Sequence, residues 1–145
     1  APSTITRLQN MGTPDYLISA ACQLVVAQRL ARRNCKDCKV PDDDVTPKVL
    51  QDLGFTAEVA SRVKAIKGKG CPKCKDTGYK GRQGIYEILS VSKPLKEAIL
   101  RQATTPELRE IAVKEGFQTM QDMGRRLIAS GDLNFREYER VLSEG

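Results

Sequence analysis

Four of the five cysteines in this 145-residue chain form two CxxC pairs, a pattern suited to binding one metal ion. Cys35 pairs with Cys38 and Cys71 with Cys74, and residues 39–70 lie between the pairs. Two such turns brought face to face present four sulfur atoms in the tetrahedral arrangement that zinc accepts, with iron as the alternative metal. We therefore predict a Zn²⁺ ion bound by these four cysteines. Because a catalytic zinc keeps one position open for water, the filled set indicates a structural ion.

The cysteines also allow two other uses, which the sequence favours less. Disulfide bonds require an oxidising compartment, and the opening residues 1–12 contain no apolar run typical of a signal peptide. A redox dithiol requires a single CxxC pair, so two matched pairs favour a shared metal. The fifth cysteine, Cys22, lies in the apolar stretch 17–27, where we expect it to pack in the core.

Positive charge is concentrated in the part of the chain that holds the cysteines. The chain has 24 Lys and Arg against 18 Asp and Glu, and residues 62–82 hold eight cations with a single anion, Asp76. Such a segment can balance the negative charge of four thiolates, or it can bind nucleic acid. Because base-stacking aromatics are scarce, we expect no nucleic-acid partner and keep a nucleic-acid-binding zinc module as the alternative. The lysines expected to flank the cage as solvated charges are Lys36, Lys39, Lys73 and Lys75.

Turn and cap residues divide the chain into short elements. Apolar residues predict a helix over 14–26, although residues 25–30 fit a strand equally well. The helix caps that we expect are Thr46, Thr56, Ser92, Thr105 and Asn134. In chain order the later elements are an acidic loop over 40–46, helices from 47 to 54 and from 56 to 66, a strand over 83–91, and helices from 92 to 102, 105 to 116, 120 to 130 and 135 to 142.

No catalytic constellation is predicted. The chain has no histidine, which excludes a Ser-His-Asp triad, a Cys-His dyad and imidazole ligands to zinc. It also lacks both GxxxxGK[ST] and GxGxxG, the glycine-rich patterns that hold phosphates. The glycines between residues 68 and 84 match neither pattern and instead surround the second cysteine pair.

Several sequence runs together resemble one family. The chain resembles the C-terminal portion of the PilB/GspE family of secretion ATPases, which assemble type IV pili and drive type II secretion. The most specific run contains the second cysteine pair, the turn glycines and the following strand in one order. The runs are APSTITRLQNMG (1–12), AQRLARRNCKDC (27–38), CPKCKDTGYKGRQGIYEIL (71–89) and ELREIAVKEGFQTMQDMG (107–124).

The resemblance implies an α+β, mostly helical fold that contains a remnant of a RecA-like core. In that family residues 27–33 would be a strand, which we prefer to a helix there. A tetracysteine zinc subdomain would be inserted into the core, and a helical domain would follow. The implied division is 1–33 for the C-terminal segment of the core (helix, then strand), 34–81 for the zinc subdomain, 82–103 for a returning strand and helix, and 104–145 for the C-terminal helical domain.

The resemblance also implies what the intact protein does. It would be a hexameric cytoplasmic ATPase, peripheral to the inner membrane, whose Walker A, Walker B and histidine-box segments lie upstream of this chain. Its partners would be neighbouring subunits and the inner-membrane platform protein, and ATP with Mg²⁺ would bind only in the intact protein. No ATP-contacting residue carries over, and the motifs do not separate pilus assembly from secretion. Arg7, Arg29 and Arg33 are candidates for a subunit interface.

We predict that this chain by itself does not hydrolyse ATP, because it contains no phosphate-binding loop. A phosphate-release assay with ATP and Mg²⁺ checks this, with buffer alone as the control. Turnover above the buffer rate would contradict the prediction.

Overall fold

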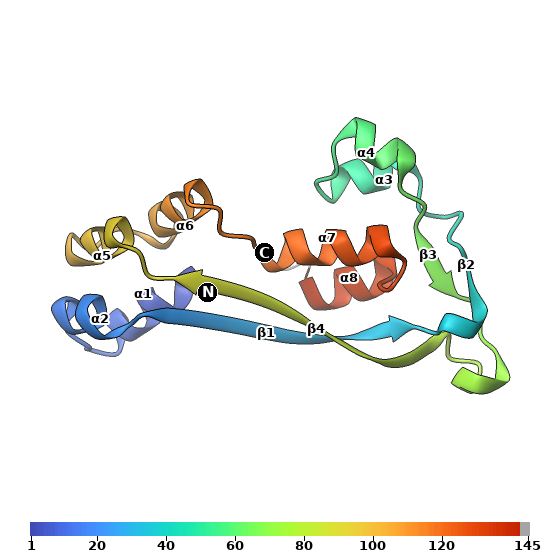
Figure 1. Cartoon of the computed structure of the whole chain (residues 1–145), viewed down its shortest axis with the longest axis horizontal. Helices are drawn as coiled ribbons and strands as arrows, with labels where there is room; N and C mark the ends of the chain where they lie inside the picture. Colours follow the sequence, from blue (N-terminus) through green and yellow to red (C-terminus); the bar gives the residue numbers. More distant parts are fainter. Residues whose placement is uncertain (143–145) are drawn as a thin grey trace. The chain divides into compact units, whose positions relative to one another are not determined.

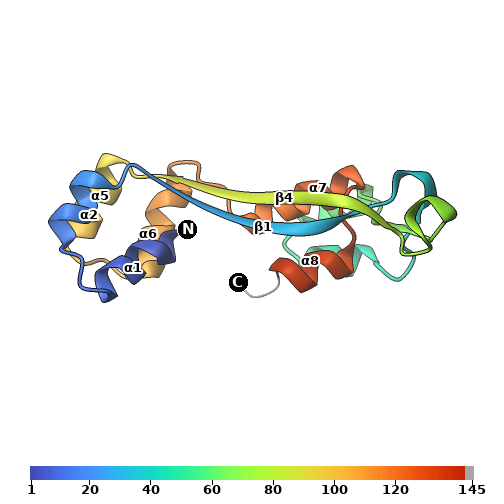
Figure 2. The same cartoon turned by 90° about the horizontal axis from the view of Figure 1, so that it is seen from below.

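The computed structural model describes residues 1–142, which form an α+β fold with two compact units. One unit combines residues 1–28 with 86–119, and the other combines residues 29–85 with the described residues from 120 onward. Two long strands, β1 (Leu24–Asn34) and β4 (Tyr79–Ser90), pair with each other (Figure 1; Figure 2). Among residues 1–142, no helix is both long enough and apolar enough to cross a bilayer.

The first unit begins with α1 (Pro2–Asn10) and α2 (Asp15–Ala21). The prediction of one helix over 14–26 is wrong, because the helix ends at Ala21 and β1 begins at Leu24. The β-branched pair Val25-Val26 favours the extended backbone, and pairing with β4 satisfies its hydrogen bonds. The strand expected over 27–33 from the family resemblance lies within β1.

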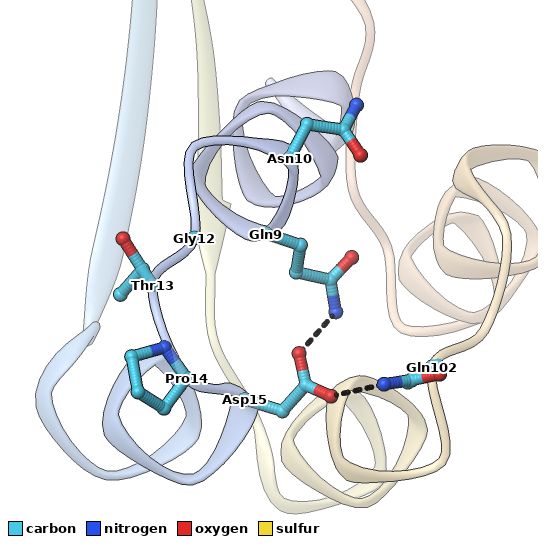
Figure 3. Close-up of a pocket in the computed structure, with 7 residues that line it drawn as sticks. All are labelled: Gln9, Asn10, Gly12, Thr13, Pro14, Asp15 and Gln102. Atoms are coloured by element: carbon cyan, nitrogen blue, oxygen red, sulfur yellow. Dashed lines mark hydrogen bonds between the residues drawn. The ribbon is translucent and has the colours of Figure 1, made fainter.

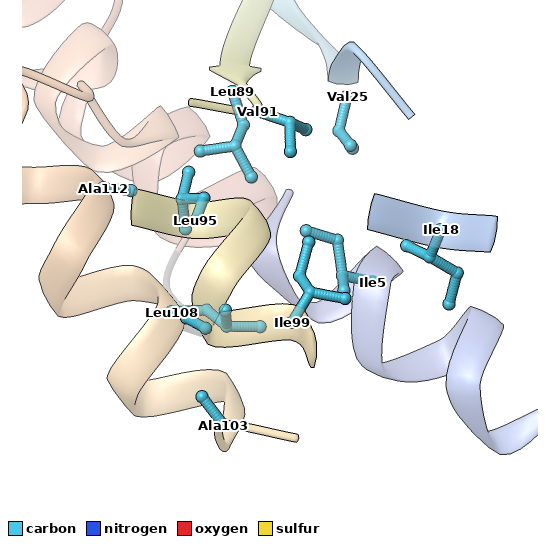
Figure 4. Packing of buried hydrophobic residues seen from close by; sticks show 11 residues of the cluster. Ile5, Ile18, Val25, Leu89, Val91, Leu95, Ile99, Ala103, Leu108 and Ala112 are labelled. Carbon is cyan, nitrogen blue, oxygen red and sulfur yellow. The ribbon is translucent and has the colours of Figure 1, made fainter. Parts of the chain in front are cut away.

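Helices α5 (Lys93–Leu100) and α6 (Thr105–Lys114) complete the first unit. Ser92 caps α5 as predicted, since its side-chain oxygen accepts from the Leu95 N–H at 3.4 Å. The cap of α6 is Thr104 and not Thr105, because the Thr104 oxygen accepts from the Glu107 N–H. Both helices direct aliphatic side chains into a common core with α1 and α2 (Figure 4). The partly buried Cys22 packs against this core. The fully buried large residues of the core are Ile5, Leu89, Leu95, Ile99 and Leu108.

The second unit contains the cysteine-bearing segment. Thr46 and Thr56 cap α3 (Pro47–Asp52) and α4 (Ala57–Arg62) as predicted, each accepting from the N–H three residues on. The helix expected to reach residue 66 is wrong at its end, because α4 stops at Arg62. Residues Ile66–Gly68 instead form β3, which pairs antiparallel with β2 (Lys39–Pro41), so part of the predicted acidic loop is a strand.

Helices α7 (Met120–Ser130) and α8 (Phe135–Leu142) pack against each other in the second unit, with the bounds that the sequence predicts. Their close approach depends on Gly124, where an added Cβ would lie 2.4 Å from Leu142 Cδ1 and 2.8 Å from Tyr138 Cε2. Asn134 caps α8 as predicted, because its Oδ1 accepts from the Glu137 N–H at 2.8 Å.

A buried carboxylate connects α8 to β1. Glu137 is fully buried and accepts from Arg32 through the backbone N–H at 2.7 Å and through the guanidinium at 2.7 and 3.0 Å. Arg140 donates to the same carboxylate at 2.7 and 2.8 Å. Burial alone would raise the pKa of Glu137, but hydrogen bonds from Arg140 and Arg32 lower it to about 2. The Arg32 guanidinium also lies over the Tyr79 ring, 4.1 Å from its centroid.

We predict that Glu137→Gln lowers the free energy of unfolding by about 2–3 kcal/mol at pH 7, because two guanidinium groups lose a buried anion. The pKa is depressed from its usual 4.5, so the stabilisation is complete above that value and is lost as the pH falls towards 2. Urea unfolding at several pH values measures the difference between the two proteins.

The matched control is Glu139→Gln, which makes the same change at an exposed position of the same helix. Its free energy of unfolding should stay within about 0.5 kcal/mol of the wild type. Equal effects of the two substitutions, or a Glu137 effect that persists at pH 2, would contradict the assignment.

Candidate metal centre

The second unit brings together the four cysteines of the two CxxC pairs. Their sulfur atoms all lie within 4.8 Å of one another. The Cys35–Cys71, Cys38–Cys74 and Cys71–Cys74 sulfur separations are 3.7, 3.8 and 3.6 Å. A tetrahedral ion with metal–sulfur bonds of about 2.3 Å requires sulfur separations of about 3.8 Å, whereas a disulfide requires about 2.05 Å. The arrangement therefore fits one tetrahedral ion.

Two short turns and one strand pair position these sulfur atoms. Cys35 directly follows β1, and the first CxxC turn contains the 3₁₀ turn η1 (Lys36–Cys38), while the second contains η2 (Pro72–Cys74). Pairing of Lys39 with Gly68 brings the two turns side by side. Backbone hydrogen bonds connect the region of each cysteine pair to the region of the other. Lys69 N donates to Cys38 O and Cys35 N donates to Gly78 O, both at 2.9 Å.

Backbone amides point at two of the sulfur atoms. Gly70 N donates to Cys38 Sγ at 3.3 Å, and the amides of Cys71 and Gly78 donate to Cys74 Sγ at 3.2 Å. Such N–H donors stabilise thiolates and hold metal ligands in place. They orient Cys38 and Cys74, one from each pair, for coordination.

The protonation states of the sulfur atoms depend on one another. Burial opposes ionisation of Cys74, yet the amides of Cys71 and Gly78 lower its pKa to about 6. Burial raises the pKa of Cys38 to about 12, and the other three sulfur atoms add to the increase. The hydrogen bond from the Gly70 amide acts in the opposite direction and lowers this pKa. Four thiolates at this distance repel one another, and a divalent cation removes that repulsion. The donor set therefore fits a cation that binds sulfur.

Two glycines allow the second turn to approach β3. An added Cβ on Gly68 would lie 1.9 Å from the Gly78 carbonyl oxygen, and one on Gly78 would lie 2.5 Å from the Gly68 oxygen. Gly78 also has a φ of +79°, in the region that disfavours other residues. The cage is therefore closed by a backbone contact that only glycine permits.

The four flanking lysines are all exposed, as predicted for solvated charges. Lys39 Nζ pairs with Asp132 at 3.5 Å, and Lys73 Nζ pairs with Asp37 at 3.7 Å. Part of the positive charge of the segment is therefore balanced by nearby carboxylates. Thiolate compensation by these lysines stays a prediction.

The three arginines singled out from the resemblance are divided between the two units. Arg7 is exposed on α1 in the first unit. In the second unit the Arg29 guanidinium donates to the Val141 carbonyl oxygen of α8, and Arg33 donates to Gln83 Oε1 at 2.7 Å. Arg29 and Arg33 therefore have structural partners within their own unit, and their place in a subunit interface stays a prediction.

A polar hollow of about 400 Å³ lies in the first unit, between the end of α1 and the start of α2 (Figure 3). Asp15 accepts from Gln9 Nε2 at 3.0 Å and from Gln102 Nε2 at 2.9 Å. These side chains satisfy one another's hydrogen bonds. They therefore form a structural connection between α2 and Gln102, which follows α5.

The sequence matches the Type II/IV secretion system protein family over residues 1–140. The chain therefore belongs to this family.

Individual relatives carry related names. The chain is 36% identical to the type IV pilus assembly ATPase PilB of Myxococcus xanthus over 137 residues, which is 94% of this chain and 24% of that protein. It is 40% identical to PilB of Thermus thermophilus over 127 residues, covering 86% of this chain and 14% of that protein. It is 34% identical to the type II secretion system ATPase E of Vibrio cholerae over 144 residues, covering 99% of this chain and 28% of that protein. The chain thus spans between 14% and 28% of the length of these relatives.

We predict that Gly68→Ala destabilises the second unit by about 1–3 kcal/mol, because the added methyl meets a backbone carbonyl that cannot rotate away. Urea unfolding followed by far-UV circular dichroism measures the loss. The control is Lys69→Ala, at the next, exposed position, which should change the free energy of unfolding by less than about 0.5 kcal/mol. A neutral Gly68→Ala would mean that β3 and the second turn do not meet as described.

Proposed function

We propose that this chain is the C-terminal part of a pilus-assembly or type II secretion ATPase, and that a structural Zn²⁺ bound by Cys35, Cys38, Cys71 and Cys74 stabilises it. The observation that carries the zinc assignment is the convergence of the four sulfur atoms, which all lie within 4.8 Å of one another, with three of the six separations between 3.6 and 3.8 Å. All four ligands are sulfur, which zinc accepts in closed, non-catalytic sites.

Zinc supplies the cross-link that the cysteine-bearing segment needs. Between the two cysteine pairs, Leu50 is the one large hydrophobic side chain that is fully buried, and the other buried hydrophobic residues are the small Ala60 and Ala65. A segment of this size with so little core depends on a metal or a disulfide for its stability. Metal binding then contributes directly to folding.

The exposed face of the long strand pair supports a place next to a larger core. Leu24 and Val26 lie two residues apart on β1, as do Tyr86 and Ile88 on β4, and each is 44–55% exposed. Alternation puts each pair on one face of its strand, and Gln28 Nε2 donates to the Tyr86 hydroxyl. Large apolar side chains gathered in this way are typical of a surface that another element covers. We infer that the RecA-like core of the intact ATPase covers it.

The proposed organisation follows the family resemblance. Residues 1–33 and 82–103 belong to the edge of the core, and residues 34–81 form the zinc subdomain. Residues 104–145 belong to the helical domain, and the last three of them lie outside the described residues. The intact protein binds ATP and Mg²⁺, forms a hexamer and works in the cytoplasm at the inner membrane. Its zinc subdomain and helices transmit ATP-driven motion to the platform protein as rigid bodies.

We predict that Cys35→Ser or Cys74→Ser abolishes stoichiometric zinc binding, because three sulfur ligands and a hydroxyl hold zinc far more weakly than four thiolates. Residues 34–81 then lose protection from amide exchange, while α6, α7 and α8 keep their helical content. Elemental analysis measures the zinc, and hydrogen exchange with circular dichroism measures the two structural effects.

Cys22→Ser is the matched control, because it makes the same change at a cysteine outside the cage. It should retain the zinc content of the wild type. Equal zinc content in all of these proteins, or none in the wild type, would refute the zinc assignment.

A further inference from the structure

Asn34 lies at the junction between the metal centre and the C-terminal helix pair. It is the last residue of β1, it is fully buried, and Cys35 directly follows it. Its side-chain Nδ2 donates to the Ile66 carbonyl oxygen of β3 at 3.2 Å and to the Gly131 carbonyl oxygen at 3.0 Å. Its backbone N–H donates to Asp132 O at 2.9 Å. One residue thus connects the first ligand to β3 and to the turn between α7 and α8.

The orientation of this amide follows from its surroundings. Both carbonyl oxygens lie on the Nδ2 side, so the opposite orientation would place Oδ1 against two oxygen atoms. Oδ1 is buried and has no hydrogen-bond partner. Asn34 therefore contributes through its two N–H donors, which an aspartate, serine or alanine side chain does not supply.

Other polar contacts join the same turn to the cysteine-bearing segment. Asp132 pairs with Lys39, the residue after the second ligand, at 3.5 Å. Asn134 Nδ2 donates to the hydroxyl of Tyr79, the residue after Gly78, at 2.9 Å. Residues 131–134, which we term the α7–α8 turn, therefore make polar contacts with the cysteine-bearing segment through Gly131, Asp132 and Asn134.

We propose that Asn34 couples metal occupancy of the four cysteines to the order of the α7–α8 turn. This inference rests on the proposed zinc site. When the metal holds Cys35 in place, Asn34 keeps its donors on Ile66 and Gly131, and the turn stays closed on β3. Because coupling between two sites is reciprocal, a turn held in place raises the affinity of the cage for zinc by the same factor.

Hydrogen exchange of the whole chain, with zinc bound and after removal by a chelator, tests the coupling. In the wild type we expect amides of residues 131–138 to exchange about tenfold faster without zinc, the size expected for losing one or two buried hydrogen bonds. In Asn34→Ala we expect zinc to bind with about tenfold lower affinity, and the exchange of residues 131–138 to change less than twofold on its removal.

Asn10→Ala is the control, since Asn10 is an exposed asparagine of the other unit. It should keep the wild-type affinity and the wild-type response. Zinc binding by the wild type without any response of residues 131–138 would overturn the coupling alone, and this measurement needs no variant. A tenfold faster exchange of residues 131–138 when zinc is removed from Asn34→Ala, as large as in the wild type, would also overturn it. A wild type that binds no zinc would overturn the zinc site and the coupling together.

Discussion

Repulsion among four converging sulfur atoms is the constraint on which the second unit depends. With all four within 4.8 Å, they cannot ionise together without a cation between them. Backbone amides donate to Cys38 and Cys74 Sγ, and a Gly68–Gly78 backbone contact closes the cage around the position of that cation. The poor apolar core between the cysteine pairs explains why so much of this segment is organised around sulfur.

Each unit is stabilised by its own set of internal interactions. The first has an apolar core of aliphatic side chains from four helices and the two long strands, which tolerates changes that preserve volume. The second also buries apolar residues, such as Ile85, Ile128 and Leu133, and adds buried directional polar groups to them. These groups are Glu137, between Arg32 and Arg140, and Asn34, between β3 and the α7–α8 turn. Polar networks specify one geometry, because each buried group is costly when its partner is lost. Such a network helps to fix the positions of the four cysteine ligands.

The cysteine cage and the polar contacts around it lie within residues 1–140, which match the Type II/IV secretion system protein family. The chain spans about a quarter of the length of relatives such as the PilB of Myxococcus xanthus, so most of such a relative has no counterpart in it. The half-exposed apolar residues on β1 and β4 are in keeping with this, since such side chains are usually covered in an intact protein. On our proposal, this chain contributes a metal-stabilised body and helices that move with the motor, and the nucleotide chemistry belongs to the remainder.

The amino-acid sequence by itself determined the features that depend on local chemistry. The CxxC spacing identified all four members of the sulfur cage, and cap residues such as Thr46 and Asn134 located helix starts, because a cap bonds to amides two or three residues away. Periodicity could not decide where α2 ends and β1 begins, or that α4 stops at Arg62 and Ile66 lies in β3, because strands are decided by partners distant in sequence. The tertiary structure alone decided the roles of Asn34 and Glu137. Asn34 acts through carbonyl groups that lie 32 and 97 positions away along the chain, and Glu137 joins its near neighbour Arg140 to Arg32, which lies 105 positions away.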